Sequence, residues 1–595
     1  MQQETSEERY QTGSSTSVQG KTQDEISTKG QGGKSSKRGK RGRDGSKGTN
    51  SYHNDPKWYL KSPRLAQLTG DINYTYPAGG DIPVVVGHTP SSATPLTYPQ
   101  NMDFTNWKTP VTWHRTLPSL LTLRVYPSVG IANSRSSALN VAANGLRTFQ
   151  RSTNTGRINY DAPDLFLYLL GNADIYAYIV WLERLASVFD GVNKLNWTIP
   201  ELFYRANYCD PDDIMPNIRK LWTGIETLII KASRLVVPDQ NAFPIFSRRA
   251  FMFEGVYTEG NSVKDQLYMF TPAAFYKWSF DDKGKGQLVL AGEDLFKPGS
   301  SLTVDQLITF GLELIDAMFL DSTHSTMSGD LLKAYGNNII KLGTFNPNLR
   351  LEPTFNIEVL EQIKNATAVG QIYGGSINQE VGEVTKGDPY LTSVYYAREG
   401  LFDNLTVDNE DQYWLNYALT GTRLLTTSTN DVSSVLTVLN TRLVNTLDPD
   451  LQFKPNPFES SQRFPMAINC GTEICEAFYT WTLDEGFEAK WDRHIQMHMT
   501  DFAPNTAAEQ LADNLSTLWR QTASLGNFKF HPIVTEVVYD YSSPHKYRVI
   551  GDTFDYDNFA MIDPNELKQI HETCLLSLFG VPDTSIGYSS SGRQA

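Results

Sequence analysis

Two histidines four residues apart offer the most specific candidate chemistry in this chain. His494 and His498 stand at positions i and i+4, so on a helix both imidazoles would lie on one face and could ligate one metal ion. The metalloprotease pattern requires a glutamate directly after the first histidine, whereas Ile495 stands there, and a third ligand would have to come from Asp492, Asp501 or elsewhere. We therefore favour two partly exposed histidines without a ligand and keep a metal-dependent hydrolase as an alternative.

The four cysteines do not form a zinc pattern. Cys470 and Cys475 are separated by four residues, and His571 lies three residues before Cys574, with no second closely spaced cysteine pair. Packed or lightly exposed reduced thiols are expected, because four cysteines are too few for a disulfide scaffold in a chain of 595 residues. A Gly-x-Ser-x-Gly elbow, a complete phosphate loop and a dinucleotide fingerprint are also missing from the sequence. We therefore predict no enzyme and no cofactor.

The most concentrated charge lies near the N-terminus. Between positions 34 and 47 seven basic residues face the single Asp44, a net charge of +6 in fourteen residues: Lys34, Lys37, Arg38, Lys40, Arg41, Arg43 and Lys47. From residue 27 to residue 51 there is no aliphatic, aromatic, Met, Cys or Ala residue, so this segment is predicted to be disordered when free. Such an arm can neutralise RNA phosphates without reading sequence. The alternatives are a solvated tail and a nuclear-localisation-like patch.

The rest of the chain is acidic and well supplied with core residues. Residues 1–50 carry ten Lys or Arg and six Asp or Glu, a net of +4, and the whole-chain charge of −14 therefore leaves −18 on residues 51–595. Hydrophobic residues make up 40% of the chain and aromatic residues 12%, which favours a folded protein of several structural units. The first eight residues contain no apolar run, so we expect no signal peptide and predict synthesis in the cytoplasm.

The longest apolar stretch, residues 165–182, is predicted to form a buried pair of helices. Gly171-Asn-Ala-Asp interrupts the stretch, and Glu183 and Arg184 follow it. Asp174 near its middle would be costly inside a bilayer. No membrane-spanning segment is therefore expected.

A helix followed by aromatic runs is the best-defined structural element. Apolar residues recur at helical spacing from Ile214 to Leu235, Asp212 can cap the first turn, Pro216 is tolerated near the start, and Pro238 blocks continuation. The aromatic runs beyond it predict strands or extended segments at 242–246, 251–257, 266–270 and 275–278.

Similar reasoning predicts the remaining elements. Helical periodicity predicts helices at 137–151, 164–170, 174–189, 199–206, 303–320, 357–369 and 505–525, and a last helix from an Asp563 cap to Gly580. Short strands are predicted at 84–86 and 120–125, and a hairpin at 532–541 and 547–550.

The central stretch resembles the capsid proteins of picobirnaviruses, small double-stranded-RNA viruses. The resemblance rests on the Asp-Asp-Ile start of the long helix, followed by Asn241-Ala-Phe-Pro-Ile-Phe-Ser-Arg-Arg, Val256-Tyr-Thr and Gln266-Leu-Tyr-Met-Phe-Thr-Pro. These segments cover about a tenth of the chain, and the overall length and the basic N-terminal arm support them. The resemblance implies an icosahedral shell built from subunit dimers, with a helical shell region, a projecting region and an internal N-terminal arm.

We therefore predict an α+β fold with a predominantly helical shell region, a smaller mixed, loop-rich projecting region and a disordered basic N-terminal arm. The predicted regions are the arm at 1–52, an extended subunit-exchange segment at 53–136, the helical shell region at 137–370, the projecting subdomain at 371–490 and the C-terminal part of the shell at 491–595. The predicted function is a structural capsid protein that assembles with itself, encloses viral double-stranded RNA and resides in the virion. The alternatives are a non-capsid RNA-binding protein and a hydrolase that uses His494 and His498.

Overall fold

The structure, a computed structural model, covers most of the chain beyond residue 118. It describes residues 55, 58–59, 61–70, 72, 119–154, 159–189, 199–260, 265–380, 388–397, 419, 421–429, 433–452, 466–483, 488–502, 521–540, 547–553 and 558–580. The chain divides into two units, Met1–Ser51 and Tyr52–Ala595, and all described residues belong to the second unit. The basic run at 34–47, the strand predicted at 84–86 and most of the helix predicted at 505–525 lie outside the described residues.

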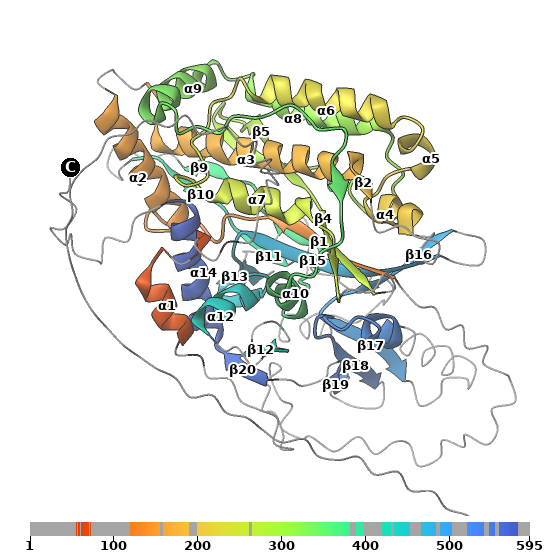
Figure 1. The fold of residues 1–595 in the computed structure, drawn as a ribbon. Coiled ribbons are helices and arrows are strands. Elements are labelled where there is room, and N and C mark those ends of the chain that lie inside the picture. The colour runs from red at the N-terminus through yellow and green to blue at the C-terminus, as the bar shows by residue number, and fades with distance from the viewer. Residues whose placement is uncertain are drawn as a thin grey trace, which may run out of the picture. The chain divides into compact units, whose positions relative to one another are not determined.

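A five-stranded mixed sheet joins distant parts of the chain (Figure 1). Its strand order is β16–β15–β1–β4–β3, with β1 at Leu120–Pro127, β3 at Tyr257–Thr258, β4 at Leu267–Pro272, β15 at Glu473–Leu483 and β16 at Ala489–His494. Strand β1 pairs antiparallel with β15 and parallel with β4. The strands predicted at 120–125 and 266–270 are thus confirmed. All eight residues of β1 are buried, as expected for a strand covered on both faces.

The other strands form smaller sheets. The strand order β13–β14–β11–β8 joins Thr446–Gln452, Met466–Asn469, Tyr395–Ala397 and Ile372–Gly374, and the order β17–β18–β19 joins Met497–Phe502, Thr535–Asp540 and Tyr547–Asp552. The two-stranded pairs are β5 (Phe275–Phe280) with β6 (Gly286–Ala291), β9 (Asn378–Glu380) with β10 (Tyr390–Thr392), β12 (Arg423–Thr427) with β20 (Asn558–Ile562), and β2 (Val188–Phe189) with β7 (Arg350–Leu351). The antiparallel pair β18–β19 confirms the predicted hairpin.

Several predicted helices are confirmed: α2 (Ala138–Thr153), α4 (Ile199–Ala206), α8 (Val304–Met318), α10 (Ile357–Lys364) and α14 (Pro564–Leu578). The sequence does not predict α1 (Pro63–Gly70), α9 (Ser322–Tyr335) or α12 (Ser434–Asn440). In α14 the side chain of Asp563 caps the first turn, as the sequence predicts. The side chain of Glu566 in turn accepts a hydrogen bond from the backbone amide of Asp563. Helix α10 is shorter than predicted because Asn365 ends it, where its side chain donates to the carbonyl oxygens of Glu361 and Thr426.

The predicted helix pair at 164–189 is wrong, because α3 runs without a break from Ala162 to Ala186. The interrupting residues are accommodated individually. The amide of Asn172 donates to the Tyr168 carbonyl, and a Cβ on Gly171 would lie 3.0 Å from the sulfur of Met318. Asp174 accepts a hydrogen bond from the Tyr276 amide at 2.6 Å. By length and composition α3 alone among the described helices qualifies to span a membrane, but its most apolar window is 94% buried, as in the core helix of a soluble protein.

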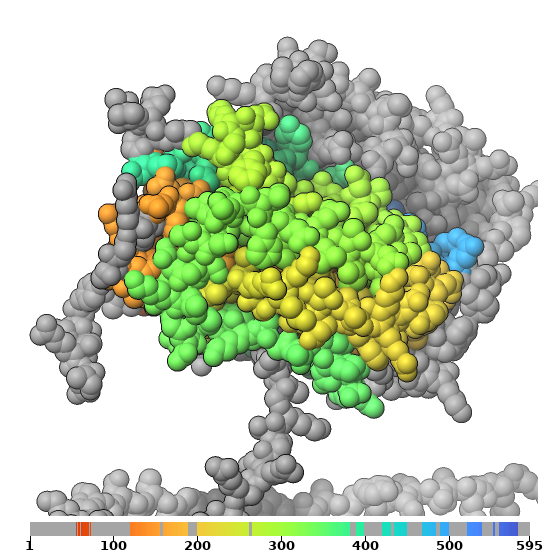
Figure 2. Space-filling model, turned by 90° about the horizontal axis from the view of Figure 1, so that it is seen from above, coloured from red at the N-terminus to blue at the C-terminus, as the bar shows by residue number. Residues whose placement is uncertain are grey.

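Helices α6 (Ile218–Ala232) and α8 (Val304–Met318) pack closely on α3 (Figure 1). A Cβ on Gly224 of α6 would lie 2.3 Å from Ile308, and a Cβ on Gly311 of α8 would lie 2.7 Å from Leu228 and 2.8 Å from Tyr178. These glycines allow the helix backbones to approach each other. Figure 2 shows this layer from above, with α6 in yellow and α9 in green.

The start of the long central helix differs from the prediction. Asp210, not Asp212, caps a short helix, α5 (Pro211–Ile214), by accepting a hydrogen bond from the Asp212 amide. Pro216 lies in the turn between α5 and α6, so the chain forms two helices where one was expected. Proline lacks the N–H that a continuous helix would need beyond its first turn.

The strands predicted at 242–246 and 251–257 are largely wrong, because Ile245–Glu254 forms helix α7. The aromatic residues of this segment favour strands by propensity. In the fold, however, α7 lies between α3 and the sheet, where its neighbouring arginines bind both layers (Figure 1). Arg248 pairs with Glu473 of β15 at 2.8 Å, and Arg249 lies 3.5 Å from Asp174 of α3. Tertiary pairing therefore overrides local propensity here.

A third buried pair lies inside the sheet. Arg124 of β1 pairs with Glu476 of β15, and its Nε donates to the Phe296 carbonyl at 2.7 Å. Burial alone would lower the pKa of Arg124, but the Glu476 carboxylate and the nearby side chains of Tyr208, Tyr126 and Tyr479 together outweigh burial and raise the pKa. The guanidinium is therefore charged and held between two neighbouring strands.

Replacement of Arg248 by methionine should strongly destabilise the protein. The side chains of Arg248 and Glu473 are 0% and 2% exposed, so the variant leaves an uncompensated buried carboxylate. We expect a loss of about 3–5 kcal/mol in the free energy of unfolding, measured by denaturant titration with tryptophan fluorescence.

The matched control is Lys231→Met, which removes an exposed ion pair with Asp316 and should cost less than about 1 kcal/mol. Equal effects of the two substitutions would contradict the structural role of the buried pair.

Candidate functional site

The residues predicted to bind RNA cannot be located in this fold. Lys34, Lys37, Arg38, Lys40, Arg41, Arg43 and Lys47 all lie outside the described residues. Their assignment stays a prediction.

The structure brings His494 and His498 together, but not on a helix. His494 ends β16 and His498 lies in β17, and the two residues are 0% and 3% exposed. The expectation of two partly exposed histidines is therefore wrong. Their rings meet through a hydrogen bond of 2.9 Å between Nδ1 of His494 and Nε2 of His498. In the part of the chain that the structure describes, no group of three or more His, Cys, Asp or Glu residues is placed to hold a metal ion.

The four cysteines are buried and free, as the sequence predicts. Burial raises the pKa of the Cys470 thiol to about 12 and that of Cys574 to about 11. Cys470 lies 3.0 Å from the hydroxyl of Ser128, and none of the four thiols is in a setting that favours the reactive thiolate. These residues are packing groups.

His571 is a buried histidine held in its neutral form. Its Nε2 donates to the Val444 carbonyl at 2.8 Å, which fixes the tautomer, while Nδ1 is buried without a hydrogen-bond partner. Burial, together with the nearby Arg442 guanidinium, lowers the pKa of His571 to about 3.

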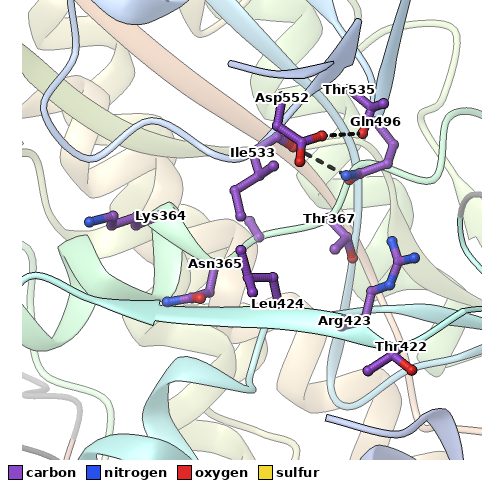
Figure 3. Close-up of a pocket in the computed structure, with 11 residues that line it drawn as sticks. Lys364, Asn365, Thr367, Thr422, Arg423, Leu424, Gln496, Ile533, Thr535 and Asp552 are labelled. Carbon is purple, nitrogen blue, oxygen red and sulfur yellow. Dashed lines mark hydrogen bonds between the residues drawn. The ribbon is translucent and has the colours of Figure 1, made fainter. Parts of the chain in front are cut away.

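A small polar cavity lies where β12 meets the β17–β18–β19 sheet (Figure 3). Its volume is about 40 Å³, room for water molecules or one small ion. The charged residues around it are Lys364, Arg423 and Asp552. Burial lowers the pKa of Arg423 to about 10, opposed by Asp552, whose carboxylate accepts a hydrogen bond from Thr535 at 2.8 Å.

Comparison with known proteins gives the decisive observation. A sequence model of the family described as "Picobirnavirus, Capsid protein" matches residues 58–382. This chain belongs to the picobirnavirus capsid protein family. Among curated proteins, the capsid protein precursor of Human picobirnavirus is 26% identical over 322 residues, which are 54% of this chain and 55% of that protein. The match thus spans about half the length of the relative.

The likeness in fold extends further than the likeness in sequence. The solved structure titled "X-ray crystallographic structure of the picobirnavirus capsid" superposes with a TM-score of 0.62 and 20% sequence identity, covering 78% of this chain and 88% of that chain. The match confirms a capsid-type fold of mixed helices and strands. The division into shell and projecting regions stays a prediction.

The family match includes both members of the Arg249–Asp174 ion pair and one member of each of the other two buried pairs. Arg124, Asp174, Arg248 and Arg249 of this picobirnavirus capsid family member lie within residues 58–382, whereas Glu473 and Glu476 lie beyond them. The sequence around the histidines carries a strand signal, because Met497 and Met499 alternate with His498 and Thr500. Residues 489–494 and 497–502 are each six-residue segments that form strands, and a period of two would have argued against the helical i, i+4 interpretation.

Acidification should destabilise this capsid protein through His571. The unfolded histidine takes up a proton near its ordinary pKa of about 6.5, whereas the folded one stays neutral down to about 3, so stability is full above the unfolded pKa and falls as pH decreases. Between about pH 7 and pH 5 the expected contribution is about 2 kcal/mol, measured by denaturant titration at both pH values.

In His571→Gln the carboxamide can still donate to Val444, but it does not titrate, so the decrease in stability should be smaller by that amount. An unchanged dependence on pH in this variant would exclude His571 as its source.

Proposed function

We propose that this protein is the structural subunit of a viral capsid, which assembles with itself as dimers into an icosahedral shell around double-stranded RNA. The observation that carries the proposal is the fold likeness to a solved picobirnavirus capsid over 88% of that chain. The subunit is synthesised in the host cytoplasm and resides in the virion.

In this proposal residues 137–370 build the shell and residues 371–490 project from it. The helices α2 to α10 all fall within the first of these segments, and the glycine-mediated packing of α3, α6 and α8 supplies the rigidity that a shell needs. Residues 491–595 return to the shell, and residues 53–136 form the segment exchanged between subunits.

The burial of the candidate catalytic histidines and cysteines supports a structural role over the hydrolase alternative. His494 and His498 direct ring nitrogens toward each other, so these atoms are engaged and shielded from solvent. The Cys470 and Cys574 thiols have raised pKa values, and the cavity near Arg423 has a volume of only about 40 Å³.

The charge distribution supports RNA contact by the arm. The net charge of +6 at residues 34–47 contrasts with −18 on residues 51–595, so the charge that can neutralise phosphates is concentrated in one short segment. An acidic body repels the packaged duplex, which keeps it mobile inside the shell.

Neutralising the arm should lower RNA packaging without preventing assembly. We expect a variant with all seven basic residues between 34 and 47 replaced by glutamine to form particles with several-fold less RNA, because RNA affinity follows the number of phosphate contacts. Particles are separated by sedimentation, and their RNA content is measured by absorbance and extraction.

The matched control replaces Arg9, Lys21 and Lys29, the basic residues of the arm outside the run, and should retain most of the RNA. Unchanged RNA content in the seven-residue variant would contradict the role of the arm, and failure of the unmodified protein to form particles would contradict the capsid function itself.

A further inference from the structure

The histidine pair is the middle of a buried chain of hydrogen bonds, which we term the histidine relay. It begins at the Glu536 carboxylate, whose Oε1 lies 2.9 Å from Nδ1 of His498. The His498 ring contacts the His494 ring at 2.9 Å, and Nε2 of His494 lies 3.0 Å from the Thr480 hydroxyl. Ser524 lies 3.4 Å from the same nitrogen. All five residues are less than 9% exposed.

The relay connects two sheets. Thr480 and His494 belong to β15 and β16 of the five-stranded sheet, whereas His498 and Glu536 face each other on the parallel strands β17 and β18 of the three-stranded sheet. Only residues 495–496 separate β16 from β17 along the chain. The hydrogen bond between the two rings therefore crosses the joint between the sheets.

Counting protons shows how the relay responds to acid. Hydrogen bonds join the ring nitrogens at three places: to Glu536, between the two rings, and from Nε2 of His494 to Thr480, with Ser524 near that same nitrogen. Two neutral rings carry two N–H groups, and the Thr480 hydroxyl then donates to His494. A single additional proton gives three N–H groups, one for each link. A second additional proton gives four N–H groups, so both nitrogens between the rings would carry hydrogen. At 2.9 Å that arrangement is repulsive.

The surrounding charges permit the first additional proton. Glu536 Oε1 also accepts from the Thr522 hydroxyl at 2.9 Å, while its Oε2 is buried without a hydrogen-bond partner, so a ring cation is well placed to balance the carboxylate. The other ionisable groups on the packed elements include Glu476, which pairs with Arg124 and Arg493, and on α4 Glu201, which pairs with Arg205. Asp492 is the remaining carboxylate of β16 near His494.

We propose that the histidine relay is an acid-sensitive joint, which holds the five-stranded and three-stranded sheets together when it carries at most one additional proton and separates them when it takes up a second. Acid favours the open form, because only the open form can carry the second additional proton. Opening exposes the facing ends of β16 and β17 and frees both histidines to become charged in water.

The direct test is hydrogen–deuterium exchange of the full-length protein, followed in peptides that cover residues 489–502 and 535–540. After correction for the intrinsic effect of pH on exchange, protection in these peptides should fall by about ten- to thirtyfold between about pH 7.5 and pH 5, the change expected for one additional proton in the open form. In His498→Gln this acid-dependent loss should largely disappear, whereas the matched control His531→Gln, whose ring contacts the Pro532 carbonyl outside the relay, should keep it.

A second variant provides an independent test in case His498→Gln does not fold. Glu536→Gln keeps an oxygen that can accept from His498 but removes the charge that balances a ring cation, so the closed relay takes up fewer protons. Its loss of protection should therefore begin at higher pH and be steeper. Constant protection of the unmodified protein across this range, or identical pH profiles for Glu536→Gln and the unmodified protein, would overturn the proposal. Acid effects through His571 act on global unfolding and therefore also lower protection in peptides from α14 and β13, which separates them from a loss confined to the joint.

Discussion

Three buried arginines determine how the main layers of this protein meet. Arg248 and Arg249 extend from α7 to different partners, Glu473 of the sheet and Asp174 of the long core helix. Arg124 joins the two central strands through Glu476. Charges removed from water are tolerated only with partners, so separating α7 from either neighbour leaves an uncompensated ion in an apolar environment. The hydrophobic core supplies the driving force for folding, and these pairs select one arrangement of the layers.

The same pairs explain where sequence reasoning succeeded and where it did not. Periodicity and capping residues located α4, α8 and α14 well because these helices have one apolar stripe and clear ends. Local rules failed for α7, whose aromatic residues favour strands, and for α3, whose interrupting Asp174 has a partner 75 positions along the chain. Neither partner is identifiable from local sequence, because the contact exists only after the layers have packed.

The candidate sites show a similar limit. The spacing of His494 and His498 was noticed, but a helical interpretation of that spacing gave the wrong geometry, since one residue ends a strand and the other lies in the next. Their partners Thr480 and Glu536 come from two further strands. The family, by contrast, was identifiable from a few short segments around α6, α7 and β4, because these residues form the tightly packed interior. The predicted boundaries between regions remain predictions, and the central sheet includes strands from both sides of several of them.

In the proposed function, residues 51–595 with a net charge of −18 build the capsid shell, and the basic run at residues 34–47 contacts nucleic acid. Electron microscopy of the purified full-length protein is the most direct test of that account. We expect closed particles of uniform diameter with icosahedral symmetry, built from paired subunits whose density accommodates the five-stranded sheet and the α3–α6–α8 layer. A population of monomers or open, irregular aggregates under all conditions of salt and pH would contradict the assignment of this protein as a capsid subunit.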